Sequence, residues 1–131
     1  MIDWSKYPNF SEDEFRCRGN DCCGHAADMD PDFIYTLQAL RSAYGKAMVI
    51  TSGYRCPDHN AAVSDSGRSG PHTTGKAADI LVSGRDAYDL LKIAMLHPFT
   101  GYGIQQKGVH TGRFIHLDTL TGTNRPMLFS Y

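Results

Sequence analysis

The stretch His72-Thr-Thr-Gly-Lys-Ala-Ala-Asp79 leads out of a polar loop into an apolar run, and this change of composition predicts a short buried strand. A second stretch, Phe114-Ile-His116-Leu-Asp118, predicts another strand near the end of the chain. Side chains alternate along a strand, so His116 and Asp118 point into the same space. A turn followed by a strand can also fold His72 and Asp79 together. We therefore expect these two stretches to organise both the sheet and a cluster of polar groups.

His72, Asp79 and His116 offer a metal ion two imidazoles and one carboxylate. This donor set suits zinc, and three protein ligands leave one coordination position open. A structural zinc normally has four protein ligands, whereas a hydrolytic zinc keeps a position for the water that it activates. Single histidines and aspartates more often have structural roles, as hydrogen-bonded side chains or as turn and cap residues. As a set, the three residues predict one catalytic Zn2+, with attack on an amide carbonyl as the reaction.

The rest of the chain predicts helices and strands around this site. Asp30 and Pro31 suit the N-cap and first turn of a helix, and apolar residues recur at helical spacing until Gly45. Residues 57–71 have the composition of a loop. We expect a second helix over 86–96 and strands over 48–51, 77–82, 101–104, 113–118 and 125–131, the last at a sheet edge. The fold class is thus a small single α+β domain over residues 1–131, with an antiparallel sheet flanked by helices.

Length and charge exclude several classes of protein. The chain has 131 residues, of which 41% are hydrophobic, enough for one core but not for two domains. The formal net charge of -1, without a long run of Lys or Arg, argues against nucleic acid as a partner. No segment is apolar enough to span a membrane, and the first residues lack the apolar region of a signal peptide. We expect a monomer that is made in the cytoplasm and has no membrane span.

Four cysteines, Cys17, Cys22, Cys23 and Cys56, are too few for a disulfide scaffold, but three of them are closely spaced. Three interpretations are open. They are a disulfide from the 17–23 loop to Cys56, free thiols, or a structural zinc bound by Cys17, Cys22, Cys23 and His25. The adjacency of Cys22 and Cys23 and the lack of a C-x-x-C motif argue against the zinc. None of the three interpretations defines the activity.

Three motifs in order resemble those of the zinc D-alanyl-D-alanine carboxypeptidase and L-alanyl-D-glutamate endopeptidase family. They are Ser52-Gly-Tyr-Arg55, His72-x-x-Gly-x-Ala-x-Asp79 and Phe114-Ile-His116-Leu-Asp118. That family shares its fold with the hedgehog signalling domain. The resemblance runs from about Phe10 to the end of the chain, and motifs in the right order are more specific than any one alone.

The resemblance implies roles for individual residues. His72, Asp79 and His116 match the zinc ligands of the family. Arg55 matches the arginine that anchors a carboxylate or carbonyl oxygen of the substrate, and its permanently charged donor fork suits this work. The alternative for Arg55 is a structural role, in which it ties its loop through backbone hydrogen bonds.

Two departures from the family pattern bear on catalysis. Many relatives have a serine two positions before the first ligand histidine, where this chain has Gly70. Several relatives have an acidic general base three positions before the last ligand histidine, and here that position is Arg113. Asp118 is then either the general base or the partner that orients His116. His110 is a further candidate, for accepting a proton or for stabilising the oxyanion.

The resemblance implies a zinc peptidase that cuts a peptidoglycan stem peptide, at D-Ala-D-Ala or at the L-Ala-D-Glu bond. The missing signal peptide and wall-binding domain suit a phage or prophage endolysin, which a holin releases to the cell wall. Arg113 favours a second hypothesis, a module that binds zinc and peptidoglycan but has lost turnover. A third hypothesis, a cysteine hydrolase using Cys56 and His59, has little support because a three-residue offset in a loop need not form a dyad.

Overall fold

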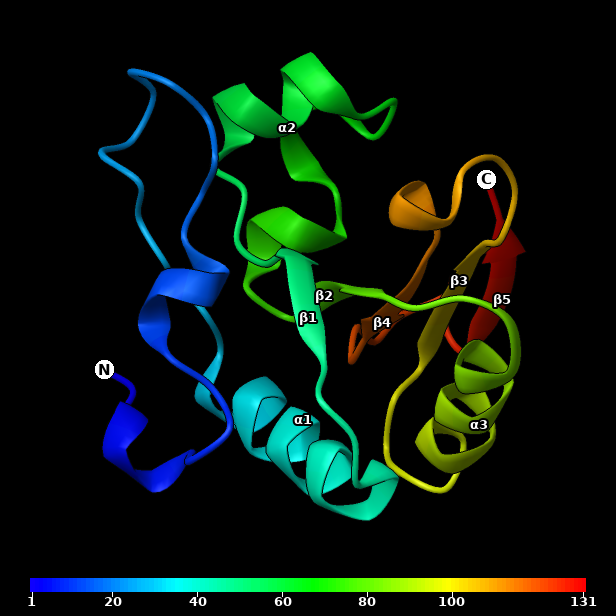
Figure 1. The fold of residues 1–131 in the computed structure, drawn as a ribbon. Coiled ribbons are helices and arrows are strands. Elements are labelled where there is room, and N and C mark those ends of the chain that lie inside the picture. Colours follow the sequence, from blue (N-terminus) through cyan, green and yellow to red (C-terminus); the bar gives the residue numbers. More distant parts are fainter.

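The computed structural model describes residues 1–131 and contains a five-stranded sheet with helices α1 and α3 beside it (Figure 1). The helices are α1 (Pro31–Tyr44), α2 (Pro57–Val63) and α3 (Gly84–Ala94). The strands are β1 (Val49–Ser52), β2 (Ala77–Leu81), β3 (Gly101–Gln105), β4 (Phe114–Asp118) and β5 (Met127–Ser130). Five short 3-10 helices, η1 to η5, lie in the connections. The α+β class predicted from the sequence is confirmed, and none of the helices is long and apolar enough to cross a lipid bilayer.

Helix α1 begins and ends where the sequence predicts. The Asp30 carboxylate accepts a hydrogen bond from the backbone N–H of Phe33 at 3.0 Å, and Pro31 occupies the first turn. Gly45 ends the helix with a φ of 74°, a left-handed conformation that glycine adopts without steric cost. The apolar face, which includes Leu37, is fully buried. This helix therefore supplies a large part of the core against which the sheet packs.

The strands lie in the order β1-β2-β4-β3-β5. The pairs β1–β2, β2–β4 and β3–β4 are antiparallel, whereas β5 runs parallel to β3. The predicted antiparallel sheet thus holds for four strands, and the edge strand β5 makes the sheet mixed. The connection 119–126 carries the chain past the start of β3 and reverses it. Strand β5 is therefore antiparallel to β4 but parallel to the strand that lies between them.

Residues of β2 and β4 alternate between two faces of the sheet. Ile80, Ile115 and Leu117 are at most 1% exposed and belong to the core with α1 and α3. Asp79 and His116 point to the opposite face, and the register places them directly across from each other. Strand pairing therefore brings together two polar side chains that are far apart in the sequence.

The segment 57–71, predicted as a loop, begins with helix α2. Cys56 is the N-cap of this helix and Pro57 its first residue, a position where a missing backbone N–H costs nothing. Asn60 is buried in the helix, and its side-chain amide donates to Ser66 Oγ at 2.9 Å. Pro57 is compatible with the start of a helix, but the Ser, Gly and Asp residues that follow give the segment the composition of a loop.

Candidate metal centre

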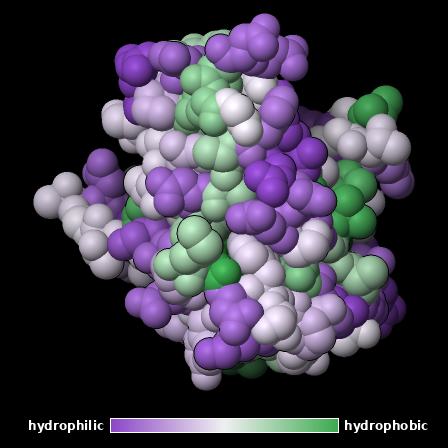
Figure 2. Space-filling view, turned by 90° about the vertical axis from the view of Figure 1, so that its left-hand side faces the viewer, coloured by the Kyte–Doolittle hydropathy of each residue, from purple (hydrophilic) through white to green (hydrophobic).

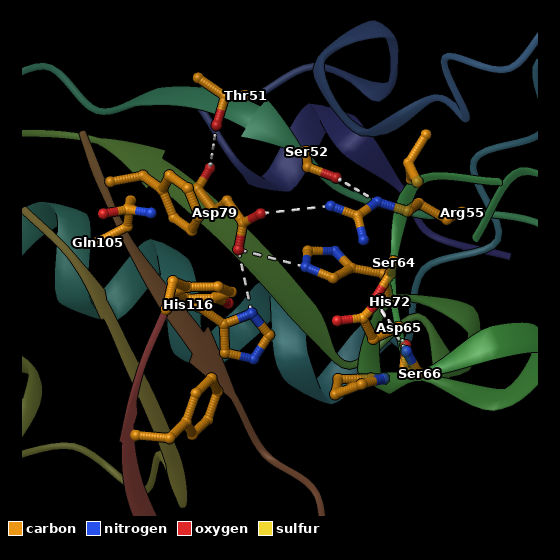
Figure 3. Close-up of a pocket in the computed structure, with 15 residues that line it drawn as sticks. Thr51, Ser52, Arg55, Ser64, Asp65, Ser66, His72, Asp79, Gln105 and His116 are labelled. Atoms are coloured by element: carbon orange, nitrogen blue, oxygen red, sulfur yellow. Dashed lines mark hydrogen bonds and ion pairs between the residues drawn. The ribbon is translucent and has the colours of Figure 1, made fainter. Parts of the chain in front are cut away.

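Three buried side chains from separate elements converge over the sheet (Figure 3). His72 comes from the 3-10 helix η4 (Pro71–Thr74), Asp79 from β2 and His116 from β4. Asp79 Oδ1 lies 3.2 Å from His72 Nε2 and 3.0 Å from His116 Nδ1. The structure therefore brings together the three residues that the sequence offers as metal ligands.

The donor atoms and their spacing fit a tetrahedral zinc ion. Zinc binds histidine nitrogen at about 2.0–2.1 Å and carboxylate oxygen at about 2.0–2.2 Å, which places neighbouring ligand atoms about 3.3 Å apart. The two N···O distances at Asp79 are close to this value, and the three ligand atoms lie within 4.8 Å of one another. Three protein ligands leave the fourth position of such an ion free for another group.

The second nitrogen of each imidazole has a fixed hydrogen-bond partner. His72 Nδ1 lies 2.7 Å from the backbone oxygen of Gly53, and Nδ1 carries the proton because a carbonyl oxygen only accepts. His116 Nε2 lies 2.8 Å from Asp118 Oδ2 and donates to that carboxylate. His72 Nε2 and His116 Nδ1, the nitrogens that face Asp79, are then the atoms that would give a lone pair to a metal ion. Partners of this kind fix the tautomer and the orientation of histidines that bind metals.

Burial and charge shift the pKa values at the centre. Burial alone would raise the pKa of Asp79, but the neighbouring His72 and His116 hold it well below its usual range. Burial would also raise the pKa of Asp118, but hydrogen bonds from His116 and Arg125 lower it. For His116, burial would lower the pKa, but hydrogen bonds to Asp118 and Asp79 raise it above 6.5. Both carboxylates are therefore ionised at neutral pH, as a cation site requires.

Asp118 is fully buried, and its carboxylate is surrounded by donors. Besides His116, it accepts hydrogen bonds from Arg125 Nε at 2.9 Å, from Arg125 Nη2 at 2.8 Å and from the backbone N–H of Leu120 at 3.2 Å. Gly101 on β3 packs so closely that a Cβ there would overlap the carboxylate. Asp118 therefore contacts Nε2 of the His116 ring, whereas Asp79 contacts Nδ1.

Arg55 lies beside the centre with its guanidinium directed at Asp79 (Figure 3). Arg55 Nη2 is 3.5 Å from Asp79 Oδ2, while Nε donates to Ser52 Oγ at 3.1 Å and Nη1 donates to Asn60 Oδ1 at 3.2 Å. A guanidinium has five N–H donors, so these contacts leave N–H groups for another acceptor. The side chain is both held in place and able to bind a further oxygen.

A cavity of about 670 Å³ opens over the centre, bordered by the three ligands and by Arg55. Asp65 and Tyr131 also border it, although neither was predicted from the sequence as a site residue. Asp65 follows α2 in a serine-rich loop and Tyr131 follows β5, so neither has neighbours in the sequence that mark it as part of a site. A substrate in the cavity would meet the metal ligands, a guanidinium, a carboxylate and a phenol.

A family model described as Peptidase M15 matches residues 8–118. The chain belongs to the peptidase M15 family. M15 peptidases are zinc-dependent, which agrees with the donor set of His72, Asp79 and His116. The resemblance inferred from the sequence motifs is thereby confirmed. A search among curated proteins returned no match.

The structure places both departures of this M15 family member from the family pattern. Arg113 does not border the cavity, and its Nε and Nη2 both donate to the backbone oxygen of Gly108, at 3.0 and 2.9 Å. At Gly70 a Cβ would overlap the hydroxyl of Ser66, which occupies the space that a serine side chain would need. Neither position therefore supplies a side chain to the metal centre.

The structure does not bring His110 to the metal centre. His110 is exposed in the 3-10 helix η5 (His110–Gly112) and borders a separate hollow beside Tyr44. The loop between β3 and β4 carries it past the end of the sheet, whereas His116 lies in the middle of β4. In this position His110 does not border the cavity over the metal ligands, where a proton acceptor or an oxyanion donor would have to lie.

Proposed function

We propose that this M15 peptidase hydrolyses an amide bond of the peptidoglycan stem peptide, either D-Ala-D-Ala or L-Ala-D-Glu. The observation that carries the proposal is the Arg55 guanidinium, which borders the same cavity as the three metal ligands. Stem peptides carry free carboxylates close to both bonds, and a guanidinium with N–H groups to spare can hold a carboxylate at a fixed distance from the metal. Degradation of the bacterial cell wall, as by a phage endolysin, is the biological role that we propose.

His72, Asp79 and His116 hold one Zn2+ in this proposal. When bound, zinc would polarise the scissile carbonyl and lower the pKa of a water molecule at the open position. Asp118 acts as a positioning residue, because its hydrogen bond to Nε2 keeps the His116 ring in place and directs Nδ1 at the metal. Rigid ligands keep the open side of the centre directed at the cavity, where Arg55 holds the peptide for attack.

Asp65 is our candidate for the proton acceptor. Asp65 and Asp79 are the two acidic residues that border the cavity, and Asp79 is occupied as a metal ligand. A carboxylate at the cavity wall can take a proton from water and pass it to the leaving amine. Asp118, considered for this role from the sequence, is enclosed by His116 and Arg125 and does not border the cavity. Asp65→Asn should therefore lower turnover by roughly 100- to 10,000-fold without changing zinc content.

To test the proposal, purified stem peptides are incubated with the zinc-loaded protein and the products are identified by mass spectrometry. Loss of a terminal alanine would identify a carboxypeptidase, and separation of L-Ala from the remainder that contains D-Glu would identify an endopeptidase. His72→Ala and a chelator-treated sample should form neither product. His97→Ala is the matched control, because the His97 ring bonds to the backbone oxygen of Ile93 away from the cavity, and it should keep full activity. Intact stem peptides after incubation with zinc-loaded wild type would refute the proposal.

Arg113 favours a second candidate, a zinc-containing module that binds peptidoglycan without cutting it. Several of the relatives that the sequence resembles have an acid at this position, and here the side chain is basic and turned to Gly108. Muropeptide binding that depends on Arg55, together with zinc at the centre and no hydrolysis, would support this alternative. Any zinc-dependent cleavage that His72→Ala abolishes would exclude it.

A further inference from the structure

Four cysteine sulfurs meet outside the metal centre, where the N-terminal loop reaches the start of α2. Cys17, Cys22 and Cys23 come from the loop, and Cys56 is the N-cap of the helix. All four sulfur atoms lie within 4.8 Å of one another. The proposed peptidase reaction does not use this cluster and so does not explain why four sulfur atoms lie together.

Two of the three short sulfur–sulfur distances match a tetrahedral metal site, and the third is shorter. Zinc binds cysteine sulfur at about 2.3 Å, so the sulfurs of a tetrathiolate site lie about 3.8 Å apart. Cys22 Sγ is 3.9 Å from Cys17 Sγ, 3.8 Å from Cys23 Sγ and 3.1 Å from Cys56 Sγ. A disulfide would join one pair of sulfurs at about 2.0 Å, and it would not account for the position of the other two. The arrangement of all four favours a metal ion over a single disulfide.

The backbone of the loop removes the objection that Cys22 and Cys23 are adjacent. Asp21 and Gly24, on either side of the pair, have φ values of 55° and 67° and so adopt the left-handed conformation. These turns let both sulfurs face the same point. Gly19 is also required, because a Cβ at this position would lie only 2.7 Å from Cys22 Sγ.

Backbone N–H groups point at two of the sulfurs. The N–H of Cys56 donates to Cys17 Sγ and the N–H of His59 donates to Cys56 Sγ, both at 3.4 Å. Such donors stabilise the negative charge of a thiolate, which is the form that binds metal. His25, offered by the sequence as a ligand, is outside the cluster, and its Nδ1 lies 2.9 Å from the backbone oxygen of Cys17. Cys56 takes the fourth place instead.

The loop has few other contacts that could order it. No apolar side chain is buried between residues 18 and 26. Figure 2 faces this side of the molecule, and the surface there mixes hydrophilic residues with apolar ones. In segments without a hydrophobic core, a bound metal commonly supplies the stability that packing does not. The cross-link would also act on the cavity, because Arg55 directly precedes Cys56 in the chain.

We propose that Cys17, Cys22, Cys23 and Cys56 bind a second, structural zinc ion. This ion joins the N-terminal loop to the start of α2 and fixes the backbone that carries Arg55. Four thiolate ligands leave no open position, so the ion takes no direct part in hydrolysis.

Metal counting with a thiol-specific reagent tests this proposal. The wild-type protein, purified under reducing conditions and loaded with zinc, should hold two zinc ions per chain by elemental mass spectrometry. An organic mercurial displaces zinc from thiolates and should release one of the two. His116→Ala should hold one zinc, all of it released by the mercurial. Cys17→Ser/Cys23→Ser should hold one zinc, none of it released.

Cobalt provides a second test that does not need a cysteine variant to fold. Co2+ bound to His116→Ala should show intense sulfur-to-metal charge-transfer absorption in the near ultraviolet, as expected for thiolate ligands. Wild-type protein with a single zinc that the mercurial does not release would overturn the proposal. So would a chain lighter by two hydrogens without a second zinc, which would show that two of the four cysteines form a disulfide. None of these measurements depends on hydrolysis, so a failure of the peptidase proposal would be seen separately.

Discussion

Replacing Asp118 by asparagine should weaken both the fold and the metal centre. The Asp118 side chain is fully buried and is paired with the His116 ring and with Arg125, whose side chain is 10% exposed. Asparagine keeps the shape but removes the charge, and it leaves the Arg125 guanidinium without its partner. Breaking a buried pair in this way costs about 3–5 kcal/mol. Because water reaches part of Arg125, we expect a loss of about 3 kcal/mol in the free energy of unfolding.

The same change should lower zinc affinity roughly 10- to 100-fold, because His116 loses the acceptor that orients it. Urea unfolding of the metal-free protein gives the stability, and competition with a chromophoric chelator gives the affinity. Asp86→Asn is the matched control. Asp86 pairs with Lys46 on the surface, where the two side chains are 58% and 48% exposed, and the expected loss is below about 0.5 kcal/mol.

A double variant sharpens the test of the Asp118 pair. Asp118→Asn/Arg125→Gln should lose less stability than the sum of the two single changes, because the second change removes the charge that the first leaves unpaired. If Asp118→Asn lost no more stability than Asp86→Asn and bound zinc as tightly as wild type, the positioning role of Asp118 would be refuted.

Contacts around the centre also control substrate binding, packing and the response to pH. Arg55→Lys should lower kcat/KM for stem peptides by roughly 10- to 100-fold with unchanged zinc content, because it loses the fork that binds a carboxylate. Gly101→Ala should destabilise the fold by about 1–3 kcal/mol and weaken zinc binding, since the new methyl group overlaps Asp118. In the control Gly112→Ala the nearest atom is 3.8 Å away, and thermal melts should show almost no change. The raised pKa of His116 means that its proton stabilises the metal-free fold below pH 6.5 and is lost as the pH rises, so this stability should decline above pH 6.5. The proton also competes with the metal for His116. Chelator titrations should therefore show that zinc affinity decreases as the pH is lowered, and that the decrease begins above pH 6.5.

Much of the metal centre could be predicted because it depends on local patterns. The strand period places His116 and Asp118 on one face, and the short turn before β2 carries His72 toward Asp79. The limits of α1 were likewise visible, because Asp30 and Gly45 act through backbone groups only a few residues away. Such local patterns can be read from the sequence because they do not depend on contacts with distant segments.

The rest depends on contacts between distant segments. The sequence left Asp118 undecided between proton transfer and orientation, and the pairing with Arg125 that encloses its carboxylate forms only when the connection after β4 folds back. Asp65 reaches the cavity because α2 directs its loop there, and the pattern of residues 57–71 concealed that helix. Cys56 likewise joins Cys22 only through the packing of the N-terminal loop on the start of α2.

X-ray anomalous scattering at the zinc edge, from crystals of the zinc-loaded protein, tests most directly whether His72, Asp79 and His116 form a metal centre open to the cavity. We predict a peak about 2.0–2.2 Å from His72 Nε2, Asp79 Oδ1 and His116 Nδ1, with the fourth position facing the cavity that Arg55 borders. A zinc-loaded crystal without a peak at these three residues would contradict the account. So would an ion there whose fourth ligand is another protein side chain.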